Sequence, residues 1–146
     1  MADFEVNDTS ISMVGLHFLA NPSSSGRRLQ RQAQADAVRR IAIEKQAAGR
    51  EVILLGDWND YDDETPDHIG SDPISKVMLI GRMMETGDFD DDLVNVAKFI
   101  NQAERYTAHW DKDNEGDVDE PDELTSIDHT RFADARGYGN EGHDSP

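Results

Sequence analysis

The alternation of apolar and polar residues predicts a strand, a long helix and a second strand in the first third of the chain. Residues 11–20 are apolar, with β-branched side chains at their start, as in a strand. Residues 27–48 have helical periodicity, and residues 51–56 are apolar throughout, as expected for a strand covered on both faces. This order predicts a parallel βαβ unit and an α/β fold.

The predicted helix carries one apolar stripe with a four-residue spacing. Ser25 is a candidate N-cap, and Gly49 is a candidate residue for ending the helix. The stripe consists of Leu29, Ala33, Ala37 and Ile41, with Val38 beside them.

The rest of the chain predicts one more helix and three shorter strands. An Asp-Pro pair opens the helix at residues 72–87, and a glycine closes it. The short strands are predicted at residues 90–99, 104–110 and 124–132. Residues 1–132 are therefore expected to form one domain, followed by a flexible tail over residues 133–146.

Composition narrows the classes of function. The chain has 14 basic and 31 acidic residues, a formal net charge of −17, so its surface repels phosphate backbones at long range. A function directed at phosphate therefore requires a divalent cation. The absence of cysteine excludes disulfides and thiolate metal sites, and no apolar run reaches the roughly 18 residues of a membrane span. The acidic N-terminus does not resemble a signal peptide.

Four polar residues occupy predicted strand positions with apolar neighbours. They are His17, Asp57, Asn59 and Asp128. Strand ends in an α/β sheet gather polar groups into one crevice. In an extended stretch, Asp57 and Asn59 point to the same face, where a carboxylate and an amide suit a water or a hard cation. The alternative is a strand closed by an ordinary polar turn.

Three motifs follow the His17 strand in a characteristic order. "VILLGDWND", "ERYTAHW" and "SIDHTRF" together resemble the endonuclease/exonuclease/phosphatase family, over residues 11–132. The nearest resemblance is to its extracellular bacterial nucleases. It implies a deoxyribonuclease-like α/β sandwich of two sheets, of which this chain would supply the second half, truncated at both ends. It also implies Mg²⁺- or Mn²⁺-dependent hydrolysis of a phosphodiester, for which a nucleic acid is a candidate substrate.

The resemblance assigns a role to each candidate residue. His17 matches the histidine that hydrogen-bonds the scissile phosphate or assists the leaving group. Asp57 matches the carboxylate that activates water or holds the metal, and Asn59 the amide that orients the phosphate. Asp128 matches the carboxylate that positions the metal, so Asp57, Asn59 and Asp128 are the implied Mg²⁺ ligands. The adjacent His129 is expected to be structural.

The departures from the family pattern leave alternatives open. The Asn and metal-binding Glu of the family's first half, and its closing Ser-Asp-His motif, have no counterpart here. The isolated chain is therefore expected to hydrolyse phosphodiesters poorly or not at all, and to associate with the missing half or with itself. The alternatives are a lipid or inositol phosphate phosphatase and a non-catalytic calcium-binding or interaction module.

An acidic insert at residues 111–123 is a second candidate site. Its spacing matches an EF-hand-type loop, with Gly116 at the sixth position, where the chain must turn sharply. The flanks have strand character, so a helix–loop–helix is not expected. The alternative is a solvated acidic loop. The candidate Ca²⁺ ligands are Asp111, Asp113, Glu115, Asp117 and Asp122.

If these carboxylates converge on one ion, millimolar Ca²⁺ will raise the melting temperature and Mg²⁺ will raise it less, because Mg²⁺ demands tighter octahedral geometry. Replacing Asp111 and Asp113 by Asn should remove most of that difference. The control is NaCl at matched ionic strength. An equal shift with NaCl would show that the ions only screen the acidic surface.

Overall fold

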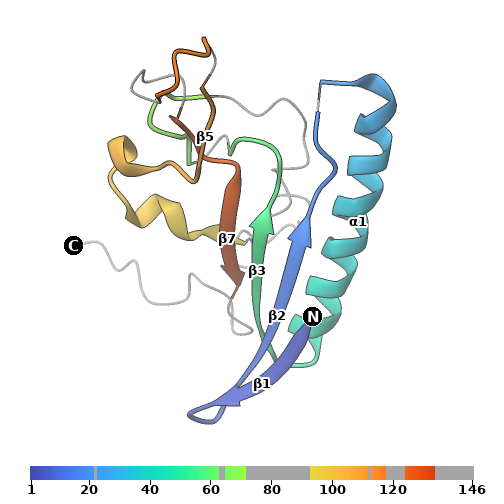
Figure 1. The fold of residues 1–146 in the computed structure, drawn as a ribbon. Helices are drawn as coiled ribbons and strands as arrows, with labels where there is room; N and C mark the ends of the chain where they lie inside the picture. Colours follow the sequence, from blue (N-terminus) through green and yellow to red (C-terminus); the bar gives the residue numbers. More distant parts are fainter. Residues whose placement is uncertain (22, 63–64, 72–92, 112, 118–123, 134–146) are drawn as a thin grey trace, which may run out of the picture.

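The computed structural model describes residues 1–21, 23–62, 65–71, 93–111, 113–117 and 124–133. These residues form a five-stranded mixed sheet with one long helix on one face and a small two-stranded sheet at one end (Figure 1). In chain order the elements are β1 (Ala2–Val6), β2 (Thr9–His17), α1 (Ser25–Ala47), β3 (Glu51–Asp57), β4 (Val94–Asn95), η3 (Val96–Phe99), η4 (Gln102–Glu104), β5 (Ala108–His109), β6 (Leu124–Thr125) and β7 (Asp128–Ala133).

The sheet confirms the predicted α/β class and the parallel βαβ unit. Its strand order is β1-β2-β3-β7-β4, and β2 and β3 run parallel with α1 as the crossover. The pairs β1–β2, β3–β7 and β4–β7 are antiparallel. β5 and β6 form the separate two-stranded sheet. The described strands therefore form an open sheet, and the finer prediction of a two-sheet sandwich goes beyond them.

Helix α1 packs on the sheet through a stripe that only partly overlaps the predicted one, because Val38 is buried and Ile41 packs against the core, whereas the other predicted positions are not buried. Its buried residues are Arg31, Ala35, Val38 and Ala42. Leu29 is 77% exposed, and Ala33 is exposed as well. A strict four-residue spacing rotates by about 40° per step around a helix of 3.6 residues per turn, so it drifts away from the core. The observed steps of four, three and four residues stay on one face.

The helix boundaries agree with the prediction only at the C-terminal end. Gly49 has a φ of +75°, and its N–H bonds to the carbonyl of Gln46 at 2.8 Å, which confirms that the helix stops there. At the other end Ser24, rather than Ser25, occupies the N-cap, and its side chain makes no capping hydrogen bond.

An N-terminal hairpin was not predicted. β1 and β2 are joined by Asn7 and Asp8, whose φ angles are +48° and +65°. Two consecutive residues of this kind form the type I′ turn that suits a two-residue hairpin. The Asn-Asp pair between two alternating stretches was the available signal.

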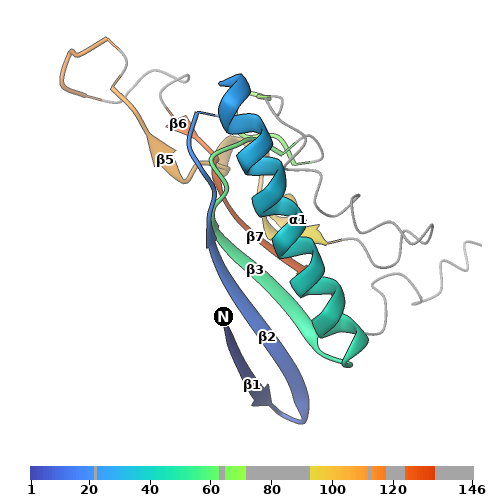
Figure 2. The same cartoon turned by 90° about the vertical axis from the view of Figure 1, so that its right-hand side faces the viewer.

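The middle of the sheet face away from α1 is apolar. The strand register places a set of half-buried side chains on it, and no described helix lies across them (Figure 2). β3 was expected to be covered on both faces, but within the described residues only the α1 face is packed. The set is Phe4, Ile11, Met13, Ile53, Leu55 and Phe132.

The later predicted strands are shorter and more interrupted than expected. Of the described residues 93–99, only those of β4 are extended, and 3₁₀ turns follow them. The last predicted strand divides into β6 and β7. The helix predicted over 72–87 and residues 134–146 of the predicted tail lie outside the described residues. None of the described helices is long and apolar enough to cross a membrane.

Gly56 offers a test of how closely β2 and β3 approach. Its φ is +135°, and a Cβ there would lie 2.0 Å from the Leu16 carbonyl oxygen. Gly56→Ala should therefore reduce the free energy of unfolding by more than about 2 kcal/mol in urea denaturation.

Gly15→Ala, on the adjoining strand, is the matched control, because a Cβ there meets nothing within 4 Å. It should change stability by no more than about 0.5 kcal/mol. Equal losses in the two variants would contradict the close approach at Gly56.

Candidate functional site

Three of the four predicted site residues lie side by side at one end of the sheet. The register pairs His17 of β2 with Asp57 of β3, and Asp57 with Asp128 of β7. β2 and β3 end at this edge and the antiparallel β7 begins there. Because paired residues share a face, all three side chains belong to the sheet face away from α1.

His17 and Asp57 form a pair that solvent can reach. The His17 Nε2 atom lies 3.4 Å from the Asp57 Oδ2 atom. Their side chains are 76% and 28% exposed, so the histidine is accessible while the carboxylate is partly shielded. The other carboxylate oxygen, Oδ1, accepts a hydrogen bond from the backbone N–H of Asn59 at 2.7 Å. Asp57 is thus held in one orientation with Oδ2 directed at the imidazole.

Asn59 reaches the site by a different geometry from the predicted one. β3 ends at Asp57, and Asn59 has a φ of +51°, so the stretch is a turn rather than extended chain. Its side-chain amide donates a 2.9 Å hydrogen bond to the carbonyl of Phe18. Asn59 therefore fastens the loop after β3 to the end of β2, and among the described residues its Oδ1 accepts no hydrogen bond.

Thr107 positions the start of β7, and the sequence analysis did not single it out. Its hydroxyl oxygen accepts hydrogen bonds from the backbone N–H groups of Ile127, at 3.2 Å, and Asp128, at 3.0 Å. These two bonds fix the backbone that carries the Asp128 carboxylate. The residue lies inside the "ERYTAHW" motif, which was the available signal.

The residues between the exposed site residues point into the protein. Trp58 is fully buried and packs edge-on against the Phe18 ring at 5.4 Å between centroids, and against the His129 ring at 6.5 Å. Its indole Nε1–H donates to the His129 carbonyl at 3.0 Å. "GDWND" thus alternates between groups that face outward and groups that anchor the loop.

A buried ion pair connects this loop to α1. The Arg31 Nη2 atom lies 3.0 Å from the Asp60 Oδ2 atom, and both side chains are fully buried. Arg31 also donates to the carbonyls of Trp58, at 3.2 Å, and Leu19. Burial lowers the pKa of Arg31, while the neighbouring Asp60 carboxylate opposes that shift.

A second buried network lies beneath β7. Arg131 pairs with Asp62, whose carboxylate also accepts a 2.7 Å hydrogen bond from Asn95. The His129 ring contacts Asn95 through Nδ1 at 3.1 Å and the Asp60 carbonyl through Nε2 at 3.2 Å. Burial, and then the positive charge of Arg131, lower the pKa of His129. His129 is therefore neutral at pH 7, with Nδ1 accepting and Nε2–H donating, in keeping with the structural role expected for it.

The acidic loop is shaped by its own carboxylates. β5 and β6 pair on either side of it, so the predicted strand character of its flanks is confirmed. Asp111 accepts backbone hydrogen bonds from Asn114, at 2.6 Å, and from Gly116, at 3.0 Å. Gly116 has a φ of +93°, the sharp turn expected at the sixth position. Of the candidate Ca²⁺ ligands, Asp122 lies outside the described residues.

Among the described residues, no group of three or more His, Asp or Glu side chains is placed to hold a metal ion. The strand-end cluster instead offers two neighbouring carboxylates and one amide oxygen.

No protein-family model and no curated protein matches the chain. The site must therefore be interpreted from the chemistry of its own residues.

Removing the charge of Arg31 should destabilise the fold strongly. Arg31→Met leaves Asp60 buried without its partner, and we expect a loss of about 3–5 kcal/mol in urea denaturation. The double variant Arg31→Met/Asp60→Leu should recover a good part of it, because no isolated charge then remains.

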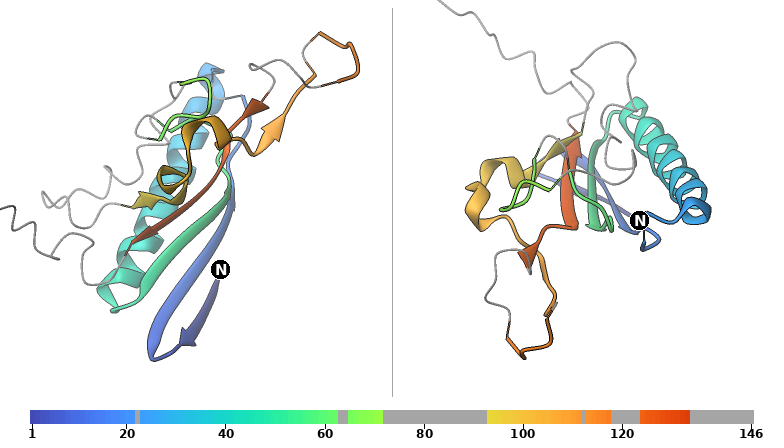
Figure 3. Two further views of the ribbon diagram at one scale, coloured as in Figure 1. Left: turned by 90° about the vertical axis from the view of Figure 1, so that its left-hand side faces the viewer. Right: turned by 90° about the horizontal axis from the view of Figure 1, so that it is seen from above.

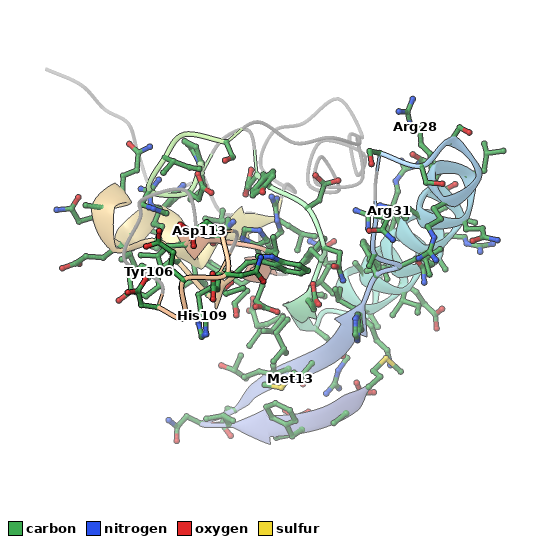
Figure 4. The ribbon with its side chains drawn as sticks, turned by 45° about the horizontal axis from the view of Figure 1, so that its top comes forward. Met13, Arg28, Arg31, Tyr106, His109 and Asp113 are labelled. Atoms are coloured by element: carbon green, nitrogen blue, oxygen red, sulfur yellow. The ribbon has the colours of Figure 1, made fainter. Side chains whose placement is uncertain are left out.

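Arg28→Met is the matched control, one turn earlier on α1. Arg28 is exposed and extends away from the protein, whereas Arg31 lies on the side that faces the sheet (Figure 4). Its replacement should change stability by no more than about 0.5 kcal/mol. Similar losses for Arg28→Met and Arg31→Met would show that the buried pair has no special weight.

Proposed function

We propose that the protein is a metal-dependent phosphoesterase that hydrolyses phosphodiesters, most simply as a nuclease. The observation that carries the proposal is the row formed by His17, Asp57 and Asp128. Three strands bring an imidazole and two carboxylates into register at one accessible edge. A general acid and metal-binding oxygens next to one another are what phosphodiester hydrolysis needs.

The cluster suits a hard divalent cation. Asp57 and Asp128 are cross-strand neighbours, and like charges in such positions repel one another unless a cation lies near. Mg²⁺ commonly binds through one or two carboxylates and keeps several waters, so Asp57 and Asp128, with the Asn59 amide oxygen, would be sufficient. Bound Mg²⁺ or Mn²⁺ would neutralise the substrate phosphate, which a surface of net charge −17 cannot do itself.

The protein's own side chains supply the proton transfers. The Asp57 carboxylate is held by a hydrogen bond from the backbone N–H of Asn59. It can therefore orient His17 or take a proton from an attacking water. The His17 imidazole is exposed, and when protonated it can donate to a phosphate oxygen or to the leaving oxygen.

The same proposal includes the architecture that the family resemblance implies. The apolar sheet face away from α1 would pack against a second sheet, as in a two-sheet sandwich. Its half-buried side chains, including Ile53, Leu55 and Phe132, support this. In a preparation of this chain alone, a second copy would be the available cover for that face.

Hydrolysis of bis(p-nitrophenyl) phosphate in Mn²⁺ tests the function. Turnover is expected to be slow, and Asp57→Asn should lower it by about 100-fold or to background. Asp128→Asn should weaken Mn²⁺ binding, measured by paramagnetic broadening of NMR signals at the strand ends.

Asp36→Asn is the control, because Asp36 is an exposed carboxylate on α1 that accepts a 3.3 Å hydrogen bond from the side chain of Gln32, away from the strand ends. It should change neither quantity. Turnover that persists in Asp57→Asn would contradict the assignment, as would an absence of both hydrolysis and Mn²⁺ binding in the unaltered chain.

A further inference from the structure

A groove runs along the start of β7, directly beside the strand-end cluster. β4 pairs with β7 only at Val94 and Asn95, and the chain then leaves the sheet as η3 and η4. This segment lies beyond β7, at the opposite edge of the sheet from β1 (Figure 1, Figure 3). The departure leaves a groove of about 170 Å³ against Ser126 and residues 128–130. Asp128 therefore belongs both to the cluster and to the wall of the groove.

The outer wall of the groove is apolar and aromatic. Val96, Ile100 and Tyr106 line it, and they are 37%, 43% and 53% exposed. Exposed apolar side chains gathered beside a polar site, on a chain in which 31% of residues are charged, mark a surface made for contact. The Tyr106 ring makes an edge contact with the His68 ring, 6.5 Å between centroids, and the side chain is otherwise exposed enough for a planar group to stack on it.

The polar part of the wall presents hydrogen-bond donors. Arg105 is held by three carbonyls, with Nε on Ile100 at 3.0 Å, Nη1 on Pro66 at 3.2 Å and Nη2 on Lys98 at 3.5 Å. A guanidinium has five N–H groups, so two of them make no hydrogen bond to the described part of the chain. Within the described residues no carboxylate forms an ion pair with it.

Thr107 adds a donor of a particular kind. Its hydroxyl oxygen already accepts two backbone hydrogen bonds, so its own proton is left to donate. It lines the groove together with Arg105. The carboxylates of Glu104 and Asp128 also line the groove, so the donors stand between negative groups rather than in a broad basic patch.

We propose that this groove is a subsite for one nucleobase of the substrate, adjoining the phosphodiester that is cleaved. The base would stack on Tyr106 against the apolar wall, with Arg105 and Thr107 donating to its edge or to its phosphate. The inference rests on the proposed function and names its substrate class. Because an acidic surface gives no long-range attraction for nucleic acid, affinity must come from such short-range contacts. A base can enter only when unstacked, so the substrate is single-stranded.

Binding of a dinucleotide to the full chain tests the subsite independently of turnover. The probes are thymidylyl-thymidine and two abasic analogues, each lacking one base, titrated calorimetrically in EDTA and in Mn²⁺. Tyr106→Ala should weaken dinucleotide binding by roughly 5- to 100-fold, the range for one stacked base. Removing the base that occupies the groove should do the same in the unaltered chain. Ile100→Ser should weaken binding in the same direction.

Phe99→Ala is the matched control. Phe99 is 62% exposed on the same segment but does not line the groove. Its replacement should leave dinucleotide affinity unchanged, and melting temperatures of the variants should match that of the parent. Undetectable dinucleotide binding, equal binding of both abasic analogues and the dinucleotide, or equal losses in Phe99→Ala and Tyr106→Ala would overturn the proposal.

The outcome also separates this inference from the proposed function. Dinucleotide binding that depends on Tyr106, with neither Asp57-dependent hydrolysis nor Mn²⁺ binding at the strand ends, would support the subsite and reject the enzyme. Asp57-dependent hydrolysis of thymidylyl-thymidine at the same rate and affinity in Tyr106→Ala would support the enzyme and reject the subsite. Tyr106-dependent binding to phosphatidylcholine vesicles, with no dinucleotide binding, would overturn the nucleobase assignment in favour of a lipid.

Discussion

The buried pair of Arg31 and Asp60 is the interaction on which the site end of the protein depends. Two opposite charges are withdrawn from water, and this is tolerable because each neutralises the other and because the backbone carbonyls of Leu19 and Trp58 accept further hydrogen bonds from the guanidinium. The pair joins α1 to the loop that follows β3, and it holds that loop under the strand ends. The exposed groups of the same loop are thereby set in place.

The alternation within "GDWND" gives the loop two functions at once. Trp58 and Asp60 anchor it, while Asp57 and Asn59 remain at the surface beside His17. A strand end so firmly fixed can hold a carboxylate in one orientation, which is what a metal-binding or proton-transferring group requires. The backbone of the neighbouring Asp128 is held by the Thr107 hydroxyl, which accepts a hydrogen bond from its N–H.

Charge gives the site its chemical character. With a net charge of −17, the protein cannot attract a phosphate ester by its surface field. A cation at the paired carboxylates and short-range contacts in the groove beside β7 are the complementary ways to overcome this. The proposed metal site and the proposed nucleobase subsite would thus both compensate for the repulsion between the acidic surface and a phosphate ester. Asp128 belongs to both.

The sequence by itself determined the βαβ unit and the end of the helix at Gly49, because periodicity and turn residues act locally. It also indicated that His17, Asp57 and Asp128 lie together, because the strand ends of one sheet meet at an edge. It placed the helix stripe only in part, at Val38 and Ile41, since the buried face also includes a charged Arg31 that no apolar pattern can reveal. Only the tertiary structure decided the turn at Asn59, the Thr107 contact with β7 and the groove under Tyr106. Each of these features depends on contacts between residues that are distant in the chain. Such contacts form only when the whole fold packs together, so no local sequence pattern predicts them.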